Sequence, residues 1–461
     1  MDGRGRIRAA LATPPGEVRR VWTEHVNPVF VRALELFGFG RDFVRAEGSS
    51  LWDAEGREYV DFLAGYGACS LGHNHPAVRA ALEEVLSRPL PHFLLVSPQP
   101  LAAELARRLA ALAPGDLDVC WLGSTGSEAV EGALKLARAA TRRPRFVSAA
   151  NSYHGTTLGA LSVSGSTRHR AGFEPLLGGC AIVPWGEVEP IERELRRRDV
   201  AAVILEPLQG EGGIRLAPSG YLREVSSLCR RYGALLVLDE VQTGLGRCGA
   251  LFACQAEGVE PDALLLGKGL SGGMAPVSAL LTRRRIWERA YGTLDRYDLH
   301  CSTFSGGPLA CAAALATLDV LEHERLPQRA AELGRELGAR LGAVTRDKPI
   351  VREVRGRGLL WGIELAAPTA GVTADLLGQW LVVGLLERGV LTQVCAETPQ
   401  VVRVQPALNV GAEAVARFGD ALEATLADHA AGVAGSIAKA AGRAVQSTIA
   451  RALTHVAGGD A

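Results

Sequence analysis

The central third of the chain alternates short apolar runs with amphipathic segments. The segments that begin at Ser127 and Tyr221 have the three- and four-residue apolar spacing of helices. Five apolar runs around them are typical of strands, at 119–122, 145–148, 201–205, 234–238 and 263–266. This alternation is typical of a mostly parallel sheet covered by helices, so the sequence predicts an α/β fold.

Other patterns flank this region. Residues 43–62 alternate in short runs broken by Gly and Asp, which indicates a small antiparallel meander. Residues 76–112 have helical spacing, and a long Ala/Leu helix is predicted from Gly307 through Leu321. The last third then has the pattern of the helices and strands of a smaller lobe.

These patterns divide the chain into four parts. We expect an N-terminal segment with part of a small domain at 1–75, a large domain at 76–325, a C-terminal small domain at 326–429 and an Ala/Gly-rich tail at 430–461. A frayed end is the simplest interpretation of the tail, and a docked helix is the alternative.

Composition narrows the classes of function. Of the 461 residues, 50 are Lys or Arg and 50 are Asp or Glu, so the formal net charge is zero and no overall field attracts nucleic acid or a membrane surface. No apolar run is long enough to span a bilayer. The nine cysteines are scattered singly, which suits neither a disulfide framework nor a zinc site. We therefore expect a soluble cytoplasmic protein without a metal site, which binds small neutral or zwitterionic ligands.

Lysine is rare in this chain, and one lysine has an unusual context. The basic residues comprise 46 arginines and only four lysines, and Lys268 directly follows an apolar run in LLLGKGLSGG. An amine can lose its proton and form a Schiff base, whereas a guanidinium stays charged. Lys268 is therefore a candidate nucleophile, and a solvated lysine at a strand end is the alternative.

Two acidic residues follow other predicted strands. Glu206 ends the run in VAAVILEPLQGEGG, and Asp239 ends the run in ALLVLDEVQTG. Ligands of parallel α/β sheets collect at the carboxyl ends of the strands, so Lys268, Asp239 and Glu206 are predicted to share one cleft. A helix or turn cap is the alternative for each carboxylate. A lysine with an aspartate for the pyridine nitrogen is the pair that pyridoxal 5'-phosphate requires.

A phosphate site is also present in the pattern. The segment WLGSTGSEAVEGALKLAR contains a strand, a turn of small residues and a helix, which would present backbone N–H groups at Thr125, Gly126 and Ser127. An ordinary capped helix is the alternative, because Ser or Thr before Glu is a common cap. Beside Lys268 and Asp239, we favour the phosphate site.

These residues resemble the class III pyridoxal-phosphate aminotransferases, the ω-aminotransferase group of fold type I. The likeness extends from about Asn27 to Leu426 and is closest to putrescine (diamine) aminotransferases. It is carried by VAAVILEPLQGEGG, by LDEVQTGLGR with LLGKGLSGG, and by STFSGGPLACAAALATLDVL. The resemblance implies a large cofactor-binding domain with a mostly parallel, seven-stranded sheet flanked by helices. It also implies a smaller α+β domain built from both chain ends.

The resemblance assigns cofactor-binding roles to individual residues. It implies that Lys268 carries the cofactor, that Asp239 pairs with its pyridine nitrogen and that Gln242 reaches its ring hydroxyl. Tyr153 would stack on the ring, with His154 beside it. Three further residues, Thr125, Gly126 and Ser127, match the phosphate loop. Thr303 matches a threonine that reaches the phosphate from the neighbouring subunit. This match implies a homodimer with active sites at the subunit interface.

The resemblance also implies how substrates bind. Arg403 matches an arginine that grips the α-carboxylate of glutamate or 2-oxoglutarate, and a surface strand arginine is the alternative. Glu206 matches a glutamate that pairs with this arginine when the amine donor has no carboxylate there. The expected reaction transfers the terminal amino group of a putrescine-like diamine or other ω-amine to 2-oxoglutarate, giving an aldehyde and glutamate.

Other functions stay open at this point. An ornithine or N-acetylornithine aminotransferase is the nearest alternative, followed by a specialised-pathway enzyme acting on an aldehyde intermediate. An aminomutase or decarboxylase would also keep Lys268 and Asp239, and a cofactor-binding protein without catalysis is a different class. The chain departs from the family pattern at STGSEA, at Gly307 and at 405–407, which leaves the donor amine open.

Overall fold

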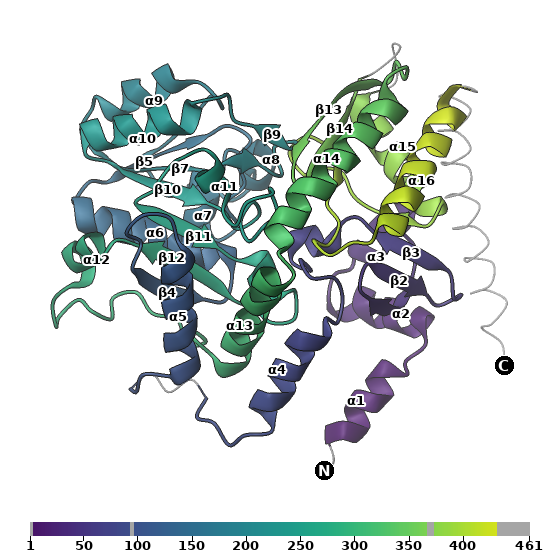
Figure 1. Cartoon of the computed structure of the whole chain (residues 1–461), viewed down its shortest axis with the longest axis horizontal. Helices are drawn as coiled ribbons and strands as arrows, with labels where there is room; N and C mark the ends of the chain where they lie inside the picture. The colour runs from purple at the N-terminus through teal and green to yellow at the C-terminus, as the bar shows by residue number, and fades with distance from the viewer. Residues whose placement is uncertain (1–2, 93–95, 367–372, 431–461) are drawn as a thin grey trace.

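The computed structural model describes residues 3–92, 96–366 and 373–430 of the 461. Figure 1 shows a large lobe built around a broad sheet and a second lobe that contains both ends of the described chain. The tail expected at 430–461 lies outside the described residues, apart from the last residue of the final helix. None of the described helices is long and apolar enough to cross a membrane.

The large lobe contains a seven-stranded sheet of order β4-β12-β11-β10-β7-β5-β6. Six strands are parallel to one another, and β12 is antiparallel to both of its neighbours, β11 and β4. The bounds are β4 Val119–Gly123, β5 Arg145–Ala149, β6 Cys180–Val183, β7 Val200–Leu205, β10 Leu235–Asp239, β11 Ala263–Leu266 and β12 Ser278–Thr282. The predicted α/β fold is confirmed. Two of its strands, β6 and β12, were not predicted from the sequence.

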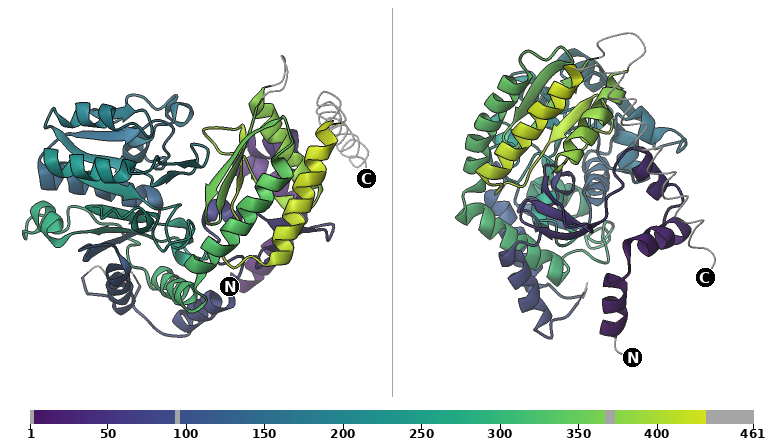
Figure 2. Two further views of the ribbon diagram at one scale, coloured as in Figure 1. Left: turned by 45° about the horizontal axis from the view of Figure 1, so that its top comes forward. Right: turned by 90° about the vertical axis from the view of Figure 1, so that its right-hand side faces the viewer.

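Alternate residues of the strands pack on opposite faces of this sheet. In β7, Ala202 and Ile204 belong to one buried apolar cluster, while Val203 and Leu205 belong to the other. Every residue of β7 is buried, as expected for a central parallel strand covered on both faces. One face is covered by α6 Gly126–Thr141, α7 Leu158–Val163 and α12 Arg284–Tyr291 (Figure 2).

The opposite face of the sheet packs against a second group of helices. Their bounds are α5 Pro100–Leu112, α9 Val188–Leu195, α10 Tyr221–Tyr232 and α13 Pro308–His323. The helix α4 Pro76–Leu86 packs on α13, and α14 Leu326–Thr345 leads from α13 into the second lobe. Four of these helices, α4, α5, α13 and α14, have proline at one of their first two positions, where its fixed φ favours helix initiation.

The second lobe joins segments that are far apart in the sequence. The strands β1 Phe43–Glu47, β2 Ser50–Asp53 and β3 Glu58–Asp61 form the predicted antiparallel meander, and β15 Val390–Leu391 adds to β3 in parallel. A separate three-stranded sheet has the order β13-β14-β16. The bounds of its strands and of the adjoining helices are β13 Val351–Arg357, β14 Leu360–Leu365, β16 Val401–Val404, α15 Ala374–Glu387 and α16 Ala412–Ala430.

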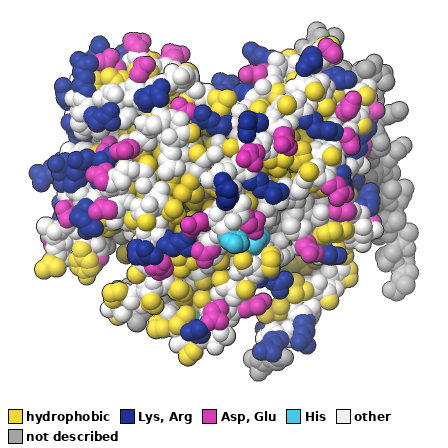
Figure 3. Space-filling view, in the orientation of Figure 1, with side chains coloured by type: hydrophobic (Ala, Val, Ile, Leu, Met, Phe, Trp, Pro, Cys, Tyr) yellow, Lys and Arg dark blue, Asp and Glu magenta, His cyan; other side chains and the backbone are white. Residues whose placement is uncertain are grey.

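Short elements complete the described chain. The N-terminal helices α1 Gly3–Leu11, α2 Pro15–His25 and α3 Phe30–Leu36 contain no buried residue. The remaining elements are η1 Ala64–Gly67, α8 Thr167–Arg170, β8 Leu208–Gln209, β9 Arg215–Leu216, α11 Ala253–Ala256 and η2 Lys268–Ser271. Basic and acidic side chains are intermingled over the face shown in Figure 3, in keeping with the zero formal net charge.

Candidate active site

Three neighbouring strands end at the same edge of the large sheet. The strands β7, β10 and β11 are adjacent and parallel, and the residues that end or follow them are Glu206, Asp239 and Lys268. The sequence reading is therefore correct that these three side chains lie at one sheet edge. Lys268 has a φ of 42°, in the left-handed region that few residues other than glycine adopt. Such strain is concentrated at functional sites.

The amine of Lys268 has one side-chain acceptor. Its Nζ donates to Oε1 of Gln242 at 2.9 Å, and Nε2 of Gln242 donates to Oε1 of Gln405 at 3.2 Å. Desolvation lowers the pKa of Lys268, and the positive charge of Arg403 acts in the same direction, against the opposing charge of Glu211. The neutral amine needed for nucleophilic attack is therefore more accessible here than in water.

Asp239 is held by two donors. Its Oδ2 lies 2.7 Å from Nδ1 of His154, and its Oδ1 accepts from the backbone N–H of Val241 at 3.1 Å. Burial by itself lowers the pKa of His154, but the hydrogen bond and the charge of Asp239 outweigh it and raise that pKa. Within the described part of the chain, the buried Nε2 of His154 has no hydrogen-bond partner.

Glu206 links two loops rather than binding Arg403. Its carboxylate accepts from the backbone N–H of Tyr153 at 3.1 Å and from that of Gly210 at 3.0 Å. Burial raises the pKa of Glu206 to about 7, and the nearby charge of Asp239 adds to the rise. The predicted pairing of Glu206 with Arg403 is wrong, because the two backbone donors hold the carboxylate in a different position.

The partner of Arg403 is Glu211. Nη2 of Arg403 lies 2.5 Å from Oε2 of Glu211, which also accepts from the backbone N–H of Ala396 at 3.0 Å. The side chain of Arg403 is 0% exposed, so it is not a surface arginine, and its guanidinium lies 5.1 Å from the ring centre of Tyr66. Glu211 is the second glutamate of EPLQGEGG, and the sequence reading missed it although the motif contains it.

The start of α6 forms a helix cap and leaves backbone N–H groups without a partner in the helix. Oγ1 of Thr125 accepts from the backbone N–H of Glu128 at 3.2 Å, and the Glu128 carboxylate accepts from that of Ser124 at 2.6 Å. The capped helix that the sequence left as an alternative is therefore formed. The N–H groups of the first turn, at Gly126 and Ser127, still have no carbonyl partner within the helix. This terminus can hold a phosphate.

Small residues let this loop approach its neighbours closely, and Gly155 cannot be replaced without a clash. A Cβ at Gly155 would lie 2.1 Å from Oγ of Ser127, and Gly155 has a φ of 121°. A Cβ at Gly126 would lie 3.0 Å from the side chain of Val241. Close backbone packing therefore brings the start of α6 next to the segments after β5 and β10.

Thr303, the residue expected to reach a neighbouring subunit, has an exposed side chain in its own chain. It lies in the loop before α13, where the hydroxyl of Ser305 donates to the carbonyl of Leu122 at 2.6 Å. Its expected contact with the phosphate of a neighbouring subunit stays a prediction. Among the described residues, no group of three or more His, Cys, Asp or Glu side chains is arranged to hold a metal ion.

Known proteins with a similar sequence or structure are aminotransferases. Residues 38–426 match the family model described as aminotransferase class-III. The chain is 42% identical over 368 residues to aminotransferase PigE of Serratia sp. (strain ATCC 39006), which covers 79% of this chain and 43% of PigE. The chain thus spans less than half the length of that relative.

Solved structures agree with this family over nearly the whole chain. The ornithine aminotransferase of Toxoplasma gondii has a TM-score of 0.82 at 32% identity, covering 92% of this chain and 98% of that one. An (S)-enantioselective omega-transaminase of Thermomicrobium roseum has a TM-score of 0.82 at 32% identity, covering 90% of this chain and 99% of that one. The fold type I architecture predicted from the sequence is thereby confirmed.

The site suits the cofactor of this family, pyridoxal 5'-phosphate. Its residues offer an amine at Lys268, a carboxylate at Asp239, an amide at Gln242 and a helix N-terminus for a phosphate. The buried Nε2 of His154 has no hydrogen-bond partner in the described chain, so a bound group could supply one. Since the family model covers most of the sequence and the site offers what this cofactor needs, the chain belongs to the class-III aminotransferases, which use pyridoxal phosphate.

Proposed function

We propose that this aminotransferase moves the terminal amino group of a putrescine-like diamine or another ω-amine to 2-oxoglutarate, giving an aldehyde and glutamate. The observation that supports this most directly is the buried ion pair of Arg403 with Glu211. An arginine fork suits a carboxylate, but here a carboxylate of the chain already occupies it. The pocket can therefore present either a neutral ion pair or an uncovered guanidinium.

Each state of the pair suits one substrate. With the pair closed, the charge of Arg403 is balanced, and an amine without a carboxylate can enter without leaving a buried charge uncompensated. When 2-oxoglutarate enters, its carboxylate replaces that of Glu211 on Arg403. Because Glu211 is also held by the backbone N–H of Ala396, it keeps one hydrogen bond when it leaves the arginine.

The remaining residues serve the bound cofactor. Pyridoxal phosphate, when bound, supplies an electron sink next to the donor carbon. Lys268 would hold the cofactor and then move a proton with its Nζ, for which its lowered pKa is suited. Asp239, supported by His154, would face the ring nitrogen, and Gln242 would reach the ring hydroxyl. Tyr153 would cover the ring, since Glu206 fixes its backbone.

We extend the proposal to the assembly and its surroundings. Thr303 is exposed in one chain and would complete the phosphate site of a second copy, so the functional unit would be a homodimer. All nine cysteines are free, which suits a reducing cytoplasm. Size-exclusion chromatography with light scattering, together with a Thr303→Ala variant mixed with a Lys268→Ala variant, tests the shared site. Thr303→Ala would affect the site of the partner subunit, whereas Lys268→Ala affects the site of its own chain. In a mixed dimer both changes therefore fall on the same site, and the other site should be active.

The experiment that tests the reaction is a donor panel on the purified holoenzyme. Putrescine, cadaverine, ornithine, N-acetylornithine, β-alanine and glutamate are each added without keto acid while the visible absorbance of the bound cofactor is followed. Loss of the absorbance with diamines and its return with 2-oxoglutarate, with aldehyde and glutamate as products, would support the proposal. No response to any diamine would contradict it.

One alternative has its own support. The structure resembles the ornithine aminotransferase of Toxoplasma gondii and, with a TM-score of 0.73 at 31% identity, an acetylornithine aminotransferase of Elizabethkingia anophelis. These names describe donors that carry an α-carboxylate. A response to ornithine or N-acetylornithine alone in the same panel would favour this alternative over the diamine.

A further inference from the structure

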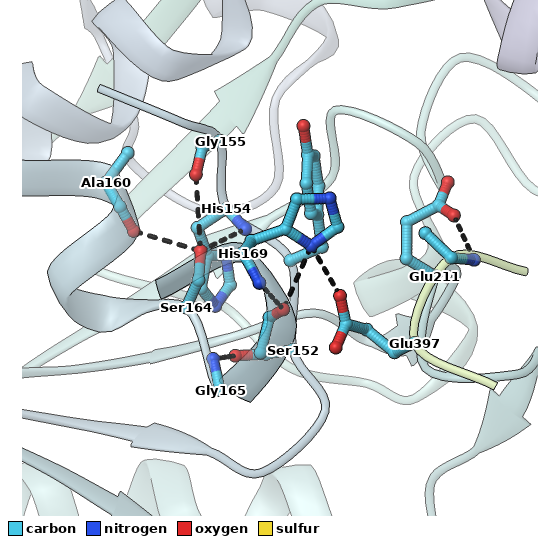
Figure 4. A network of polar contacts seen from close by, with 12 residues as sticks. Ser152, His154, Gly155, Ala160, Ser164, Gly165, His169, Glu211 and Glu397 are labelled. Atoms are coloured by element: carbon cyan, nitrogen blue, oxygen red, sulfur yellow. Dashed lines mark hydrogen bonds and ion pairs between the residues drawn. The ribbon is translucent and has the colours of Figure 1, made fainter. Parts of the chain in front are cut away.

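A second acidic residue, Glu397, is hydrogen-bonded through its backbone to Glu211 of the Arg403–Glu211 pair. Oε1 of Glu397 lies 2.6 Å from Nδ1 of His169 on α8, and the Glu397 side chain is only 4% exposed. Figure 4 shows the imidazole directed at this carboxylate, with Glu211 close by in the neighbouring segment. A carboxylate only accepts hydrogen bonds, so Nδ1 of His169 must carry a hydrogen.

The position of Glu397 is fixed from two sides. Its backbone N–H donates to the carbonyl of Glu211 at 3.1 Å, which ties the segment before β16 to the loop after β8. On the other side, Oγ of Ser166 accepts from the backbone N–H of His169 at 3.0 Å and lies 2.9 Å from its Nδ1. Glu397 is therefore held in one place before any substrate arrives, which favours specific recognition.

Glu397 is linked through His169 to Tyr153, the residue expected to cover the cofactor ring. The ring of His169 meets that of Tyr153 edge to face, with centroids 5.5 Å apart. Burial raises the pKa of Tyr153, and the charges of Glu211 and Glu397 raise it further, so both carboxylates lie near this phenol. The acidic groups that act on Lys268 are instead Glu211, Asp239 and Glu206. By its contacts, Glu397 therefore neighbours Glu211 on one side and, through His169, Tyr153 on the other.

The carboxylates of Glu211 and Glu397 have different ion-pair partners. Glu211 is paired with an arginine that is always charged, whereas in the described part of the chain the only ion-pair partner of Glu397 is an imidazole. A donor whose reacting amine is at Lys268 would direct its other end past Tyr153 toward this carboxylate. An ammonium at that end would be attracted, and a carboxylate would be repelled.

We propose that Glu397, positioned by His169, binds the second ammonium group of a diamine donor and so determines the class of amine that the enzyme accepts. This inference rests on the proposed function and adds the residue that would distinguish a diamine from a monoamine. Glu397 is a specificity residue that touches the donor, and His169 is a positioning residue that acts through it.

The first test compares putrescine with butylamine, which has the same carbon chain but one amine. In the wild-type holoenzyme, kcat/KM should favour putrescine. Glu397→Gln should reduce that preference about tenfold, mainly through KM, because one charge-assisted hydrogen bond is lost, and the change should be much smaller for butylamine, which has no second ammonium group. The matched control is Glu194→Gln on α9, which removes a carboxylate 2.6 Å from Arg145 of β5 and should keep the preference.

A binding measurement separates recognition from turnover. Reduction of the holoenzyme with borohydride fixes the cofactor and stops the reaction, after which calorimetry measures the dissociation constants of both amines. The wild type should bind putrescine more tightly than butylamine, and Glu397→Gln should lose that difference. A full diamine preference in Glu397→Gln, in kinetics and in calorimetry, would overturn the inference.

Two variants of His169 provide a test that leaves Glu397 unchanged. His169→Lys places a permanent cation against the carboxylate and should reduce the diamine preference, whereas His169→Gln keeps a neutral donor and should retain it. Equal preferences in the two variants would count against the inference even if Glu397→Gln did not fold. Failure of every amine to donate to 2-oxoglutarate in the wild type would instead contradict the proposed function, and calorimetry would still test Glu397.

Discussion

Nδ1 of His154 lies 2.7 Å from Oδ2 of Asp239, and both side chains are buried. This hydrogen bond and the charge of Asp239 overcome the effect of burial and raise the pKa of His154, so the histidine carries a proton more readily than in water. Asp239 thereby keeps a cationic neighbour, while Val241 binds its other oxygen. We therefore expect His154 to act on the cofactor through Asp239.

Removing this support should weaken cofactor binding. His154→Gln keeps an amide donor but loses the positive charge, so we expect an about tenfold larger dissociation constant for pyridoxal phosphate and a smaller loss in kcat. Asp239→Asn removes the carboxylate itself and should lower kcat by about 10²-fold or more. Cofactor release measured by fluorescence, with circular dichroism as a check of folding, distinguishes the two. Wild-type cofactor affinity in His154→Gln would contradict this role.

Lys268 should be irreplaceable by arginine. Its Nζ contacts Gln242, and desolvation lowers its pKa, whereas a guanidinium would stay charged at any working pH. We expect Lys268→Ala and Lys268→Arg each to reduce amino transfer at least about 10³-fold and to change the visible absorbance of the bound cofactor. Lys348→Arg, on the other lobe, is the matched control and should behave as wild type. Turnover near wild type in Lys268→Ala would exclude the proposed chemistry.

The sequence predicted the location of the site better than its contacts. Asp239 and Lys268 each mark the end of an apolar run, and parallel strands bring such ends to one edge, so their proximity follows from the pattern alone. Whether Glu206 or Glu211 reaches Arg403 depends on how the loop after β7 folds. The backbone N–H groups of Gly210, in this loop, and of Tyr153, in the segment after β5, bind Glu206. The five-residue separation of the two glutamates in the sequence indicates neither contact.

The direction of a strand was equally hidden. β12 has the sequence SALLT and is buried throughout like β11, yet it is antiparallel to both of its neighbours, β11 and β4. Hydrophobic pattern reports burial, and burial is the same for either direction. The likeness to class III aminotransferases supplied the seven-stranded sheet that the pattern alone did not.

Stability should depend on pH through His73. Its Nε2 lies 2.9 Å from Oδ2 of Asp61, and this hydrogen bond, followed by a contact with Cys69, raises the pKa of His73 from 6.5 to about 10. Because the folded-state pKa is raised, the stabilisation is fully present below pH 6.5 and is lost as the pH rises through about 10.

Replacement of His73 tests this dependence. We expect His73→Gln to lose about 2 kcal/mol at pH 6, a modest figure because the ring is partly exposed to solvent, and much less at pH 10. Thermal melting of both proteins at the two pH values measures the difference. His25→Gln, at a largely exposed histidine, is the control and should change little. A difference in melting temperature that is the same at both pH values would exclude the ion pair as its cause.

The Arg403–Glu211 pair predicts opposite effects on the two substrates. Glu211→Gln leaves the buried charge of Arg403 unbalanced, so donors without a carboxylate should bind more weakly while 2-oxoglutarate should bind as well or better. Arg403→Met removes the guanidinium that would bind the carboxylate of 2-oxoglutarate. KM for 2-oxoglutarate should therefore rise about 10- to 100-fold, with little change in KM for the amine. Each of these substitutions leaves one buried charge without its partner, so both variants should have a lower melting temperature than the wild type.

Glu206→Gln serves as the comparison for this pair, because Glu206 binds backbone N–H groups and does not contact Arg403. It should lower activity through the position of Tyr153, yet keep the wild-type ratio of the KM values for amine and 2-oxoglutarate. Steady-state kinetics with both substrates varied gives that ratio for all three variants. If Glu206→Gln changed the ratio and Glu211→Gln did not, the choice between substrates would depend on Glu206, and the pairing seen here would not be the one that operates in catalysis.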